Sequence, residues 1–346
     1  MSAFVIHEPR VAAAPILVDS PHSGFTLPED FATVAPLDAL RTTWDAFVDE
    51  LWMDATAHGA ALLVAKFPRA YVDVNRAEDD LDPTLLATAW PSPLQPTDYS
   101  RRGMGLIRRL ALPGVPMYTG ALDVATVERR LAQYYRPYRA ALRERIEALH
   151  AQFGVAVLLD AHSMKSRGNA MNVDAGAARP DVVVSDRRGT TADPQLTAFV
   201  AEHFAVHGYR VQVNEPYQGG DLVRSVGDPA RGVHAIQVEV NRARYLDEAR
   251  CLPSAEFSRL GEVCAACVEE LAALSLRVGL QPRLRDVGIP EDALAKMAAD
   301  AMKQQRLLVN NPRPLTRADA FANQRRDVRP RWMIDTRLKD VVGQRP

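Results

Sequence analysis

The feature that most constrains this chain is the alternation of short apolar runs with longer amphipathic segments. Short apolar runs are typical of buried strands, whereas apolar residues at helical intervals are typical of helices that pack on a sheet. The runs expected to form strands are 15–19, 60–65, 71–74, 155–159, 182–184, 209–213 and 234–240, and the segments expected to form helices are 121–153, 193–207 and 256–276. This alternation predicts an α/β fold with a mixed, largely parallel sheet flanked by helices.

Two segments interrupt the alternation. Residues 77–116 hold EDDLDP, WPSPLQP and RRG and show no sustained period. A segment of that length in a compact domain is more often functional than a passive connection. Beyond residue 280, Pro290 begins a helical pattern that the NPRP run ends, which predicts a helical C-terminal appendage. Within 121–153, Pro137 is expected to kink the helix or split it in two.

Charge and cysteine content narrow the functional classes. The chain has 42 Lys and Arg against 43 Asp and Glu, a formal net charge of −1, which argues against a nucleic-acid-binding surface. No apolar run approaches the length of about 18 residues that a membrane span needs, and the N-terminal MSAFVIHEPR lacks the apolar core of a signal peptide. Three cysteines are too few for a disulfide scaffold. We expect a cytoplasmic protein that binds neither nucleic acid nor membrane.

Polar side chains follow four of the expected strands. The sequences at these points are DSPHSG, DVNR, DAHSM and EVNR, which contain His22, Asn75 with Arg76, His162 and Glu239. In α/β sheets ligands bind beyond the carboxyl ends of the strands, so we expect these side chains to meet at one edge. Asp160, two residues before His162, is a candidate to orient that imidazole.

Two imidazoles and a carboxylate suit a catalytic zinc site that keeps one position open for water. Each histidine alone could equally be a hydrogen-bonded loop residue. The third ligand is open, because the His-x-x-Glu pattern of zinc carboxypeptidases is missing: Phe25 stands three residues after His22. Asp45 is the best substitute, ahead of Asp49, although acidic residues in the first turn of a helix also complement its dipole.

Two other metal-like patterns are better explained by packing. His203 and His207 have the spacing of a helical zinc motif but lack its glutamate, so we expect surface or half-buried helix residues. Cys264 and Cys267 form a single CxxC inside an Ala- and Leu-rich helix, with no second pair. Buried helix packing is the favoured interpretation there.

Six ordered motifs resemble the N-formylglutamate amidohydrolase family: SPHSG, WDAFVDELW, YVDVNR, LLDAHSM, NEPYQGGDLVRSVGDP and HAIQVEVNRARYLDE. The resemblance runs from about Pro15 to Glu248. That family looks distantly related to zinc carboxypeptidases and to aspartoacylase and succinylglutamate desuccinylase. The resemblance implies a zinc-carboxypeptidase-like (phosphorylase/hydrolase-like) fold. Because the residues from His22 to Glu239 are expected to build one site, we expect one catalytic domain at residues 1–280 and a helical C-terminal extension at residues 281–346.

The resemblance also implies roles for individual residues. His22 and His162 match the metal-binding histidines, and Glu239 matches the general base and acid of the related deacylases. Asn75 and Arg76 match a pair that holds a substrate carboxylate. Arg69 stands where the relatives place an arginine over the developing oxyanion. The implied cofactor is one zinc ion per chain, or another divalent metal.

The loop after residue 213 offers two further candidates. Arg224, after a Gly-Gly pair, is a candidate for the side-chain carboxylate of a glutamate-like substrate or else a surface residue. Tyr217 could donate a hydrogen bond there or merely pack.

The implied activity is hydrolysis of the amide bond of N-formyl-L-glutamate or a similar N-acyl amino acid, a small anionic substrate. Alternatives are a deacylase of a different N-acyl amino acid and a non-catalytic metal- or ligand-binding relative. The segment GIPEDALAKMAADAMKQQRLLVNNPRPLTRADA resembles the C-terminal helical segment of iron-dependent alcohol dehydrogenases. It matches none of that family's metal or nucleotide positions, and we assign it no dehydrogenase function. The oligomeric state stays open.

Overall fold

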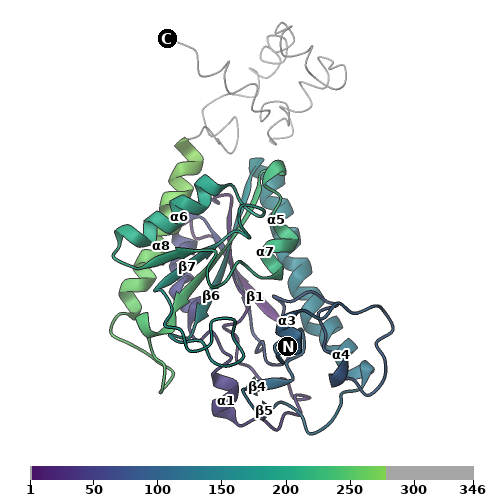
Figure 1. Ribbon diagram of the computed structural model, residues 1–346. Coiled ribbons are helices and arrows are strands. Elements are labelled where there is room, and N and C mark those ends of the chain that lie inside the picture. Colours follow the sequence, from purple (N-terminus) through teal and green to yellow (C-terminus); the bar gives the residue numbers. More distant parts are fainter. Residues whose placement is uncertain (1, 278–346) are drawn as a thin grey trace, which may run out of the picture.

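A seven-stranded sheet organises the computed structural model, which describes residues 2–277 (Figure 1). Its order is β1-β3-β2-β6-β9-β7-β8. The strands are β1 (Phe4–His7), β2 (Ile16–Ser20), β3 (Ala61–Ala65), β6 (Ala156–Met164), β7 (Val182–Ser185), β8 (Val211–Val213) and β9 (Val233–Asn241). The four central strands β3, β2, β6 and β9 run parallel, whereas β1 and the β7–β8 pair run antiparallel to their neighbours. The expected mixed, largely parallel sheet is confirmed.

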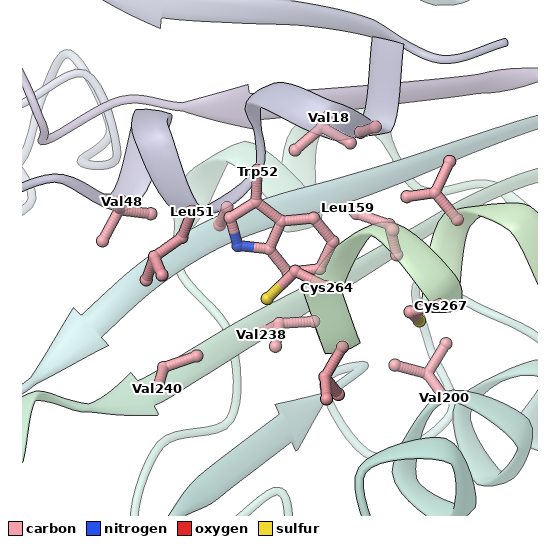
Figure 2. Close-up of a cluster of buried hydrophobic side chains, with 14 of the residues drawn as sticks. Val18, Val48, Leu51, Trp52, Leu159, Val200, Val238, Val240, Cys264 and Cys267 are labelled. Atoms are coloured by element: carbon pink, nitrogen blue, oxygen red, sulfur yellow. The ribbon is translucent and has the colours of Figure 1, made fainter. Parts of the chain in front are cut away.

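Helices cover both faces of this sheet. One face packs against α2 (Val48–Leu51), α6 (Pro194–Val206) and α8 (Phe257–Arg277). The other packs against α4 (Val124–Arg130), η3 (Leu131–Tyr135), α5 (Arg136–Phe153) and α7 (Asp221–Val226). Two buried apolar clusters fill the spaces between the layers, and Figure 2 shows part of the first, where Trp52 and Cys264 lie between strand and helix residues.

The expected helices are present with one local change. Residues 193–207 and 256–276 correspond to α6 and α8. The helical segment 121–153 is divided into α4 and α5 by η3, a π turn that ends at Tyr135, so that Pro137 lies in the first turn of α5. Since proline has no N–H to donate to the preceding turn, a wider turn is a common way to pass it within a continuous helix.

The expected strand at 71–74 is wrong. This segment is irregular, although Tyr71, Val72 and Val74 are fully buried. Its backbone bonds to another loop instead of a strand, for example from Asp73 N to Leu106 O at 2.8 Å. The apolar run therefore reflected burial in the second apolar cluster of the core and not strand pairing. Edge strand β1, which is half-buried throughout, was missed.

Residues 77–116 are mostly irregular, as expected. They contain η2 (Pro83–Leu85), α3 (Asp98–Arg101), β4 (Leu110–Leu112) and β5 (Val115–Pro116). The remaining short elements are α1 (Leu37–Arg41), η1 (Met53–His58), η4 (Pro229–Arg231), η5 (Arg242–Arg244), β10 (Leu246–Asp247) and β11 (Leu252–Pro253). No helix among residues 2–277 is both long and apolar enough to cross a bilayer. The predicted extension at 281–346 lies outside the described residues.

The two patterns assigned to packing lie in the helical layer. Cys264 and Cys267 are free thiols buried in the apolar cluster of Figure 2. His203 is more buried than expected, because it joins α6 to α8: its Nε2 lies 2.9 Å from Val263 O and its Nδ1 lies 3.0 Å from Glu270 Oε2. His207 is half-buried.

Candidate active site

Three buried side chains converge near the carboxyl ends of β2 and β6. His22 lies two residues beyond β2, His162 lies near the end of β6, and Asp45 lies in the turn before α2. The expected helix start at Asp45 is wrong, since α2 begins at Val48 and Asp45 N instead bonds to His22 O at 3.1 Å. One ligand atom from each residue lies within 4.8 Å of the other two. The sequence-predicted metal ligands are thus brought together.

The two imidazoles present the same nitrogen to Asp45. Nδ1 of His162 lies 3.2 Å and Nδ1 of His22 lies 3.6 Å from Asp45 Oδ2. The opposite nitrogens face other carboxylates: His22 Nε2 lies 2.7 Å from Asp73 Oδ1, and His162 Nε2 lies 2.8 Å from Asp160 Oδ1. Asp73, by accepting the Nε2 proton of His22, fixes the tautomer of that ring and leaves its Nδ1 lone pair free to bind a cation.

The donor chemistry of this cluster fits a divalent metal. Nδ1 of His22 is buried and has no hydrogen-bond partner within the described residues. Burial alone would lower the pKa of His162, but Asp160 and Asp45 raise it well above its usual value, so the cluster attracts positive charge. Two imidazole nitrogens and one carboxylate oxygen are ligands that zinc accepts in catalytic sites.

Asp45 and Asp73 are each held by an arginine. Arg242 Nη2 donates to Asp45 Oδ1 at 2.8 Å. Arg69 donates from Nη2 and Nε to Asp73 Oδ2 at 2.7 and 3.1 Å. Although burial alone would raise them, the pKa values of both carboxyls stay well below their usual range, through hydrogen bonds from the two histidines for Asp45 and chiefly through the charge of Arg69 for Asp73. Both groups are therefore ionised at neutral pH.

Glu239 lies beside this cluster. In the pairing of β6 with β9 it stands opposite His162, and both side chains line one open pocket. Gln237 Nε2 donates to Glu239 Oε1 at 3.1 Å. Burial raises the pKa of Glu239, and the nearby Asp45 carboxylate adds to the rise. A carboxyl with a raised pKa is suited to exchanging a proton near neutral pH.

Arg76 and Asn75 line the same pocket but differ in whether their polar groups are already hydrogen-bonded within the protein. Arg76 lies over the Tyr99 ring at 4.0 Å, and its Nε is 3.9 Å from Asp73 Oδ2. The Asn75 amide is engaged by the protein: Oδ1 accepts from Leu222 N at 2.8 Å, and Nδ2 lies 2.9 Å from His162 Nε2. A Cβ at Gly220 would lie 2.2 Å from Asn75 Oδ1, so only glycine permits this approach.

The two candidate substrate-binding residues in the loop after residue 213 lie in different places. Tyr217 lines the pocket, where Arg179 lies 5.2 Å from its ring centre. Arg224 does not line it; its side chain is 55% exposed and its Nε donates to Asp221 Oδ1 at 2.8 Å. Arg224 instead borders a neighbouring depression.

Several lining residues had no predicted role. They include Tyr99, Arg108, Lys165, Arg179, Gln237 and Arg242. Arg242 follows Asn241 directly after a predicted strand, and that position could have identified it. Arg108 lies in residues 77–116, whose length marked the segment as functional but gave no means of choosing one arginine among several.

Comparisons with known proteins give two separate results. Residues 232–324 match the C-terminal domain of the Fe-containing alcohol dehydrogenase family. Long-chain-alcohol dehydrogenase 1 of Geobacillus thermodenitrificans is 47% identical over 67 residues, which are 19% of this chain and 17% of that protein. This match agrees with the resemblance seen in the C-terminal segment and is confined to a minor part of both chains.

The larger part of the chain matches a different family. Residues 14–246 match the N-formylglutamate amidohydrolase family. An N-formylglutamate deformylase from Pseudomonas aeruginosa is 32% identical over 262 residues, covering 74% of this chain and 91% of that protein, and one from Pseudomonas putida is 30% identical over 239 residues, covering 68% and 82%. The crystal structure of N-formylglutamate amidohydrolase from Ralstonia eutropha JMP134 superposes with a TM-score of 0.76 at 37% identity, over 80% of this chain and 99% of that one. This chain belongs to the N-formylglutamate amidohydrolase family.

Proposed function

We propose that this protein hydrolyses the amide bond of N-formyl-L-glutamate, or of a close N-acyl amino acid, to the free acid and the amino acid. The observation that carries the proposal is the buried His22–Asp45–His162 cluster with Glu239 on the adjacent strand. The names of the two Pseudomonas relatives support the substrate.

The cluster would hold one zinc ion or another divalent metal. When bound, such an ion polarises a carbonyl and lowers the pKa of a water ligand to about 7. His22 and His162 would bind through Nδ1, because Asp73 and Asp160 hold their Nε2 atoms. Arg242 fixes the orientation of Asp45, the third ligand.

Glu239 would move the proton. It would accept a proton from the water that attacks the formyl carbon, and the new C–O bond would form as the carbonyl oxygen gains charge. Glu239 would then give that proton to the amide nitrogen as the C–N bond breaks, which releases the amine and formic acid, and the acid loses its remaining proton to become formate at neutral pH. Its burial, which raises its pKa, suits a group that must both take and return a proton.

Two positively charged arginines would interact with negatively charged groups of the substrate. Arg69 would stabilise the developing oxyanion, since it lines the pocket and is held rigidly by Asp73. Arg76 would bind the α-carboxylate through its planar fork, with Tyr99 fixing the guanidinium from one side. Asn75 would act by positioning His162 and the loop at Gly220, because its amide is already engaged.

Glu239→Gln tests this assignment. The variant keeps the shape of the side chain but removes the base, so formate release from N-formyl-L-glutamate should fall by roughly 100- to 10,000-fold. Metal analysis should still find about one zinc per chain, because Glu239 is not one of the three proposed ligands. The matched control is Glu256→Gln, at an exposed residue that pairs with Arg259, and it should retain full activity.

Retained turnover in Glu239→Gln would remove Glu239 from the mechanism. Failure of the wild type to bind any divalent metal, after reconstitution, would remove the proposed metal chemistry. A protein that binds metal but hydrolyses no N-acyl amino acid would be a non-catalytic relative.

A further inference from the structure

Basic side chains outnumber acidic ones in the lining of the pocket beside the His22–Asp45–His162 cluster. Its lining includes two carboxylates, Asp45 and Glu239. It also includes six basic side chains: Arg69, Arg76, Arg108, Lys165, Arg179 and Arg242. A basic side chain in this lining that no carboxylate of the chain already pairs with is suited to an anionic ligand.

Most of the arginines are already paired within the protein. Arg69 and Arg76 face Asp73, with closest distances of 2.7 and 3.9 Å. Arg179 makes two hydrogen bonds to Asp174, and Arg242 pairs with Asp45 at 2.8 Å. Carboxylates of the chain thus hold the guanidinium groups of Arg69, Arg179 and Arg242 through hydrogen bonds. Arg76 is held differently, since its guanidinium lies over the Tyr99 ring and its Nε has no hydrogen-bond partner in the described residues.

Arg108 is different. It is only 7% exposed, yet its guanidinium makes no hydrogen bond or ion pair in the described part of the chain, and its Nε is buried without a partner. Burial and the charges of Arg69 and Arg76 lower the pKa of Arg108 to about 9, which leaves it charged at neutral pH. A buried charge without a partner is costly to the fold, so a ligand anion is the natural partner.

The segment that carries Arg108 is held in place before any ligand arrives. Leu106 and Ile107 are fully buried, and Leu106 bonds through N to Asp80 O at 2.9 Å and through O to Asp73 N at 2.8 Å. On the other side, Arg109 Nε donates to Asp82 Oδ2 at 2.8 Å. The position of Arg108 in the pocket is therefore preorganised, which limits the entropy lost on binding.

We propose that Arg108 binds the side-chain carboxylate of the substrate and thereby selects N-acyl amino acids with an acidic side chain. The inference rests on the proposed function, in which Arg76 takes the α-carboxylate. It replaces Arg224, whose exposed guanidinium lies outside the pocket lining. Lys165 also lines the pocket, but a planar guanidinium can bind a carboxylate through two parallel hydrogen bonds and an ammonium cannot.

Arg108→Met, which removes the charge and keeps an unbranched apolar chain, tests the proposal by its effect on selectivity. The two substrates are N-formyl-L-glutamate and N-formyl-L-glutamine, which differ only in the side-chain charge. Loss of a charged hydrogen bond should lower kcat/KM for the glutamate substrate by roughly 10- to 100-fold. The value for the glutamine substrate should change by less than about threefold, because its side chain ends in a carboxamide and has no carboxylate for Arg108 to bind. Arg108→Lys should fall between the wild type and Arg108→Met on the glutamate substrate.

The control is Arg101→Met, in the same segment, whose side chain is 65% exposed and pairs with Asp98. It should leave kcat/KM for both substrates unchanged. An equal loss on both substrates in Arg108→Met would overturn the proposal and assign Arg108 to the α-carboxylate or to the fold. No loss on either substrate would overturn it as well.

A binding measurement separates this inference from the proposed function. Glutarate and butyrate, titrated calorimetrically into the metal-loaded protein, contain no amide and differ by one carboxylate. The wild type should prefer glutarate, and Arg108→Met should lose that preference. If the wild type hydrolysed no N-formyl amino acid, the proposed function would fail and the titration alone would decide the role of Arg108. Absence of a glutarate preference in the wild type would reject that role.

Discussion

At the scale of single residues, the candidate site depends on a buried aspartate, Asp73, that does not line the pocket. Asp73 is fully buried, and its two oxygens serve different groups: Oδ1 lies 2.7 Å from His22 Nε2, while Oδ2 accepts from Arg69 Nη2 at 2.7 Å. Its Oδ1 also accepts from Asn75 N at 3.0 Å. One carboxylate therefore sets the orientation of a proposed metal ligand, of the proposed oxyanion arginine and of the segment leading to Arg76.

Asp73→Asn should lower the free energy of metal binding by more than it lowers the free energy of unfolding. The amide keeps the volume but loses the charge that holds the His22 tautomer, and loss of such a partner typically lowers metal affinity by about 10- to 100-fold. Competition with a chromophoric chelator measures that affinity. Asp98→Asn, at an exposed residue paired with Arg101, is the control and should bind zinc as the wild type does. Unchanged affinity in Asp73→Asn would mean that His22 is positioned by packing alone.

The sequence located the residues at the centre of the candidate site better than the residues that line the pocket around them. The apolar runs next to His22, His162 and Glu239 do form strands, namely β2, β6 and β9. The carboxyl ends of parallel strands lie at the same edge of a sheet, so these side chains could be expected to lie close together. No predicted strand placed Arg108, because its segment is irregular. Its position depends on the backbone hydrogen bonds of Leu106 with Asp73 and Asp80, which no local sequence pattern encodes. The same limit explains why Arg224 was an attractive candidate: a Gly-Gly pair nearby says nothing about exposure.

At the scale of elements, the sheet changes direction where β9 meets β7, and Asp181 marks this junction. Its backbone O accepts from Asn241 N at 2.8 Å. Its buried side chain accepts from Arg210 N at 2.9 Å, from Arg210 Nη2 at 3.0 Å and from Arg244 Nε at 2.7 Å. Burial alone would raise the pKa of Asp181, but these hydrogen bonds hold it below its usual value. One carboxylate therefore joins β7, β8 and the turn after β9.

Asp181→Asn should destabilise the protein in a pH-dependent way. Loss of the charged hydrogen bonds should lower the free energy of unfolding at pH 7 by about 1–3 kcal/mol. Because the folded pKa is the lower one, this contribution is complete above the unfolded pKa of about 3.9 and is lost as pH falls through the folded pKa. Urea unfolding should therefore give a constant difference from the wild type above about pH 5 and a shrinking one below about pH 4. Asp54→Asn, whose partner Arg10 is exposed, should show little of either effect. A difference that persists at low pH would point to lost packing instead.

Element prediction succeeded where burial and period agreed. Strands β2, β3, β6, β7, β8 and β9 all overlap predicted runs. Strand β6 continues to Met164, beyond the predicted end at residue 159, so His162 lies within the strand. The failures have opposite causes. Residues 71–74 are fully buried in a loop, so they had the composition of a strand without a strand partner, whereas β1 is a half-buried edge strand with a weaker apolar signal.

At the scale of the whole molecule, the proposed metal ligands connect parts of the chain that are distant in sequence. His22 follows β2, Asp45 precedes α2 on one face of the sheet, and His162 belongs to the central strand β6. A cation that binds all three joins the loop after β2 and the α2 layer to the sheet. Since these ligands converge only in the folded chain, binding of the cation must favour the folded state.

Removing the metal should therefore lower the thermal stability of the full chain. At a free metal concentration of about 100 times Kd, binding adds about 2.7 kcal/mol, which in a domain of this size corresponds to a Tm shift of roughly 3–6 °C. Differential scanning fluorimetry with a chelator, followed by zinc titration, measures the loss and its recovery. Asp45→Ala, which removes one ligand and leaves Arg242 unpaired, should have a lower Tm than the metal-loaded wild type and a much weaker response to zinc. The apo protein should still unfold cooperatively, because two buried apolar clusters pack both faces of the sheet independently of the site. A Tm that is equal with chelator and with zinc in the wild type would contradict metal binding at His22, Asp45 and His162.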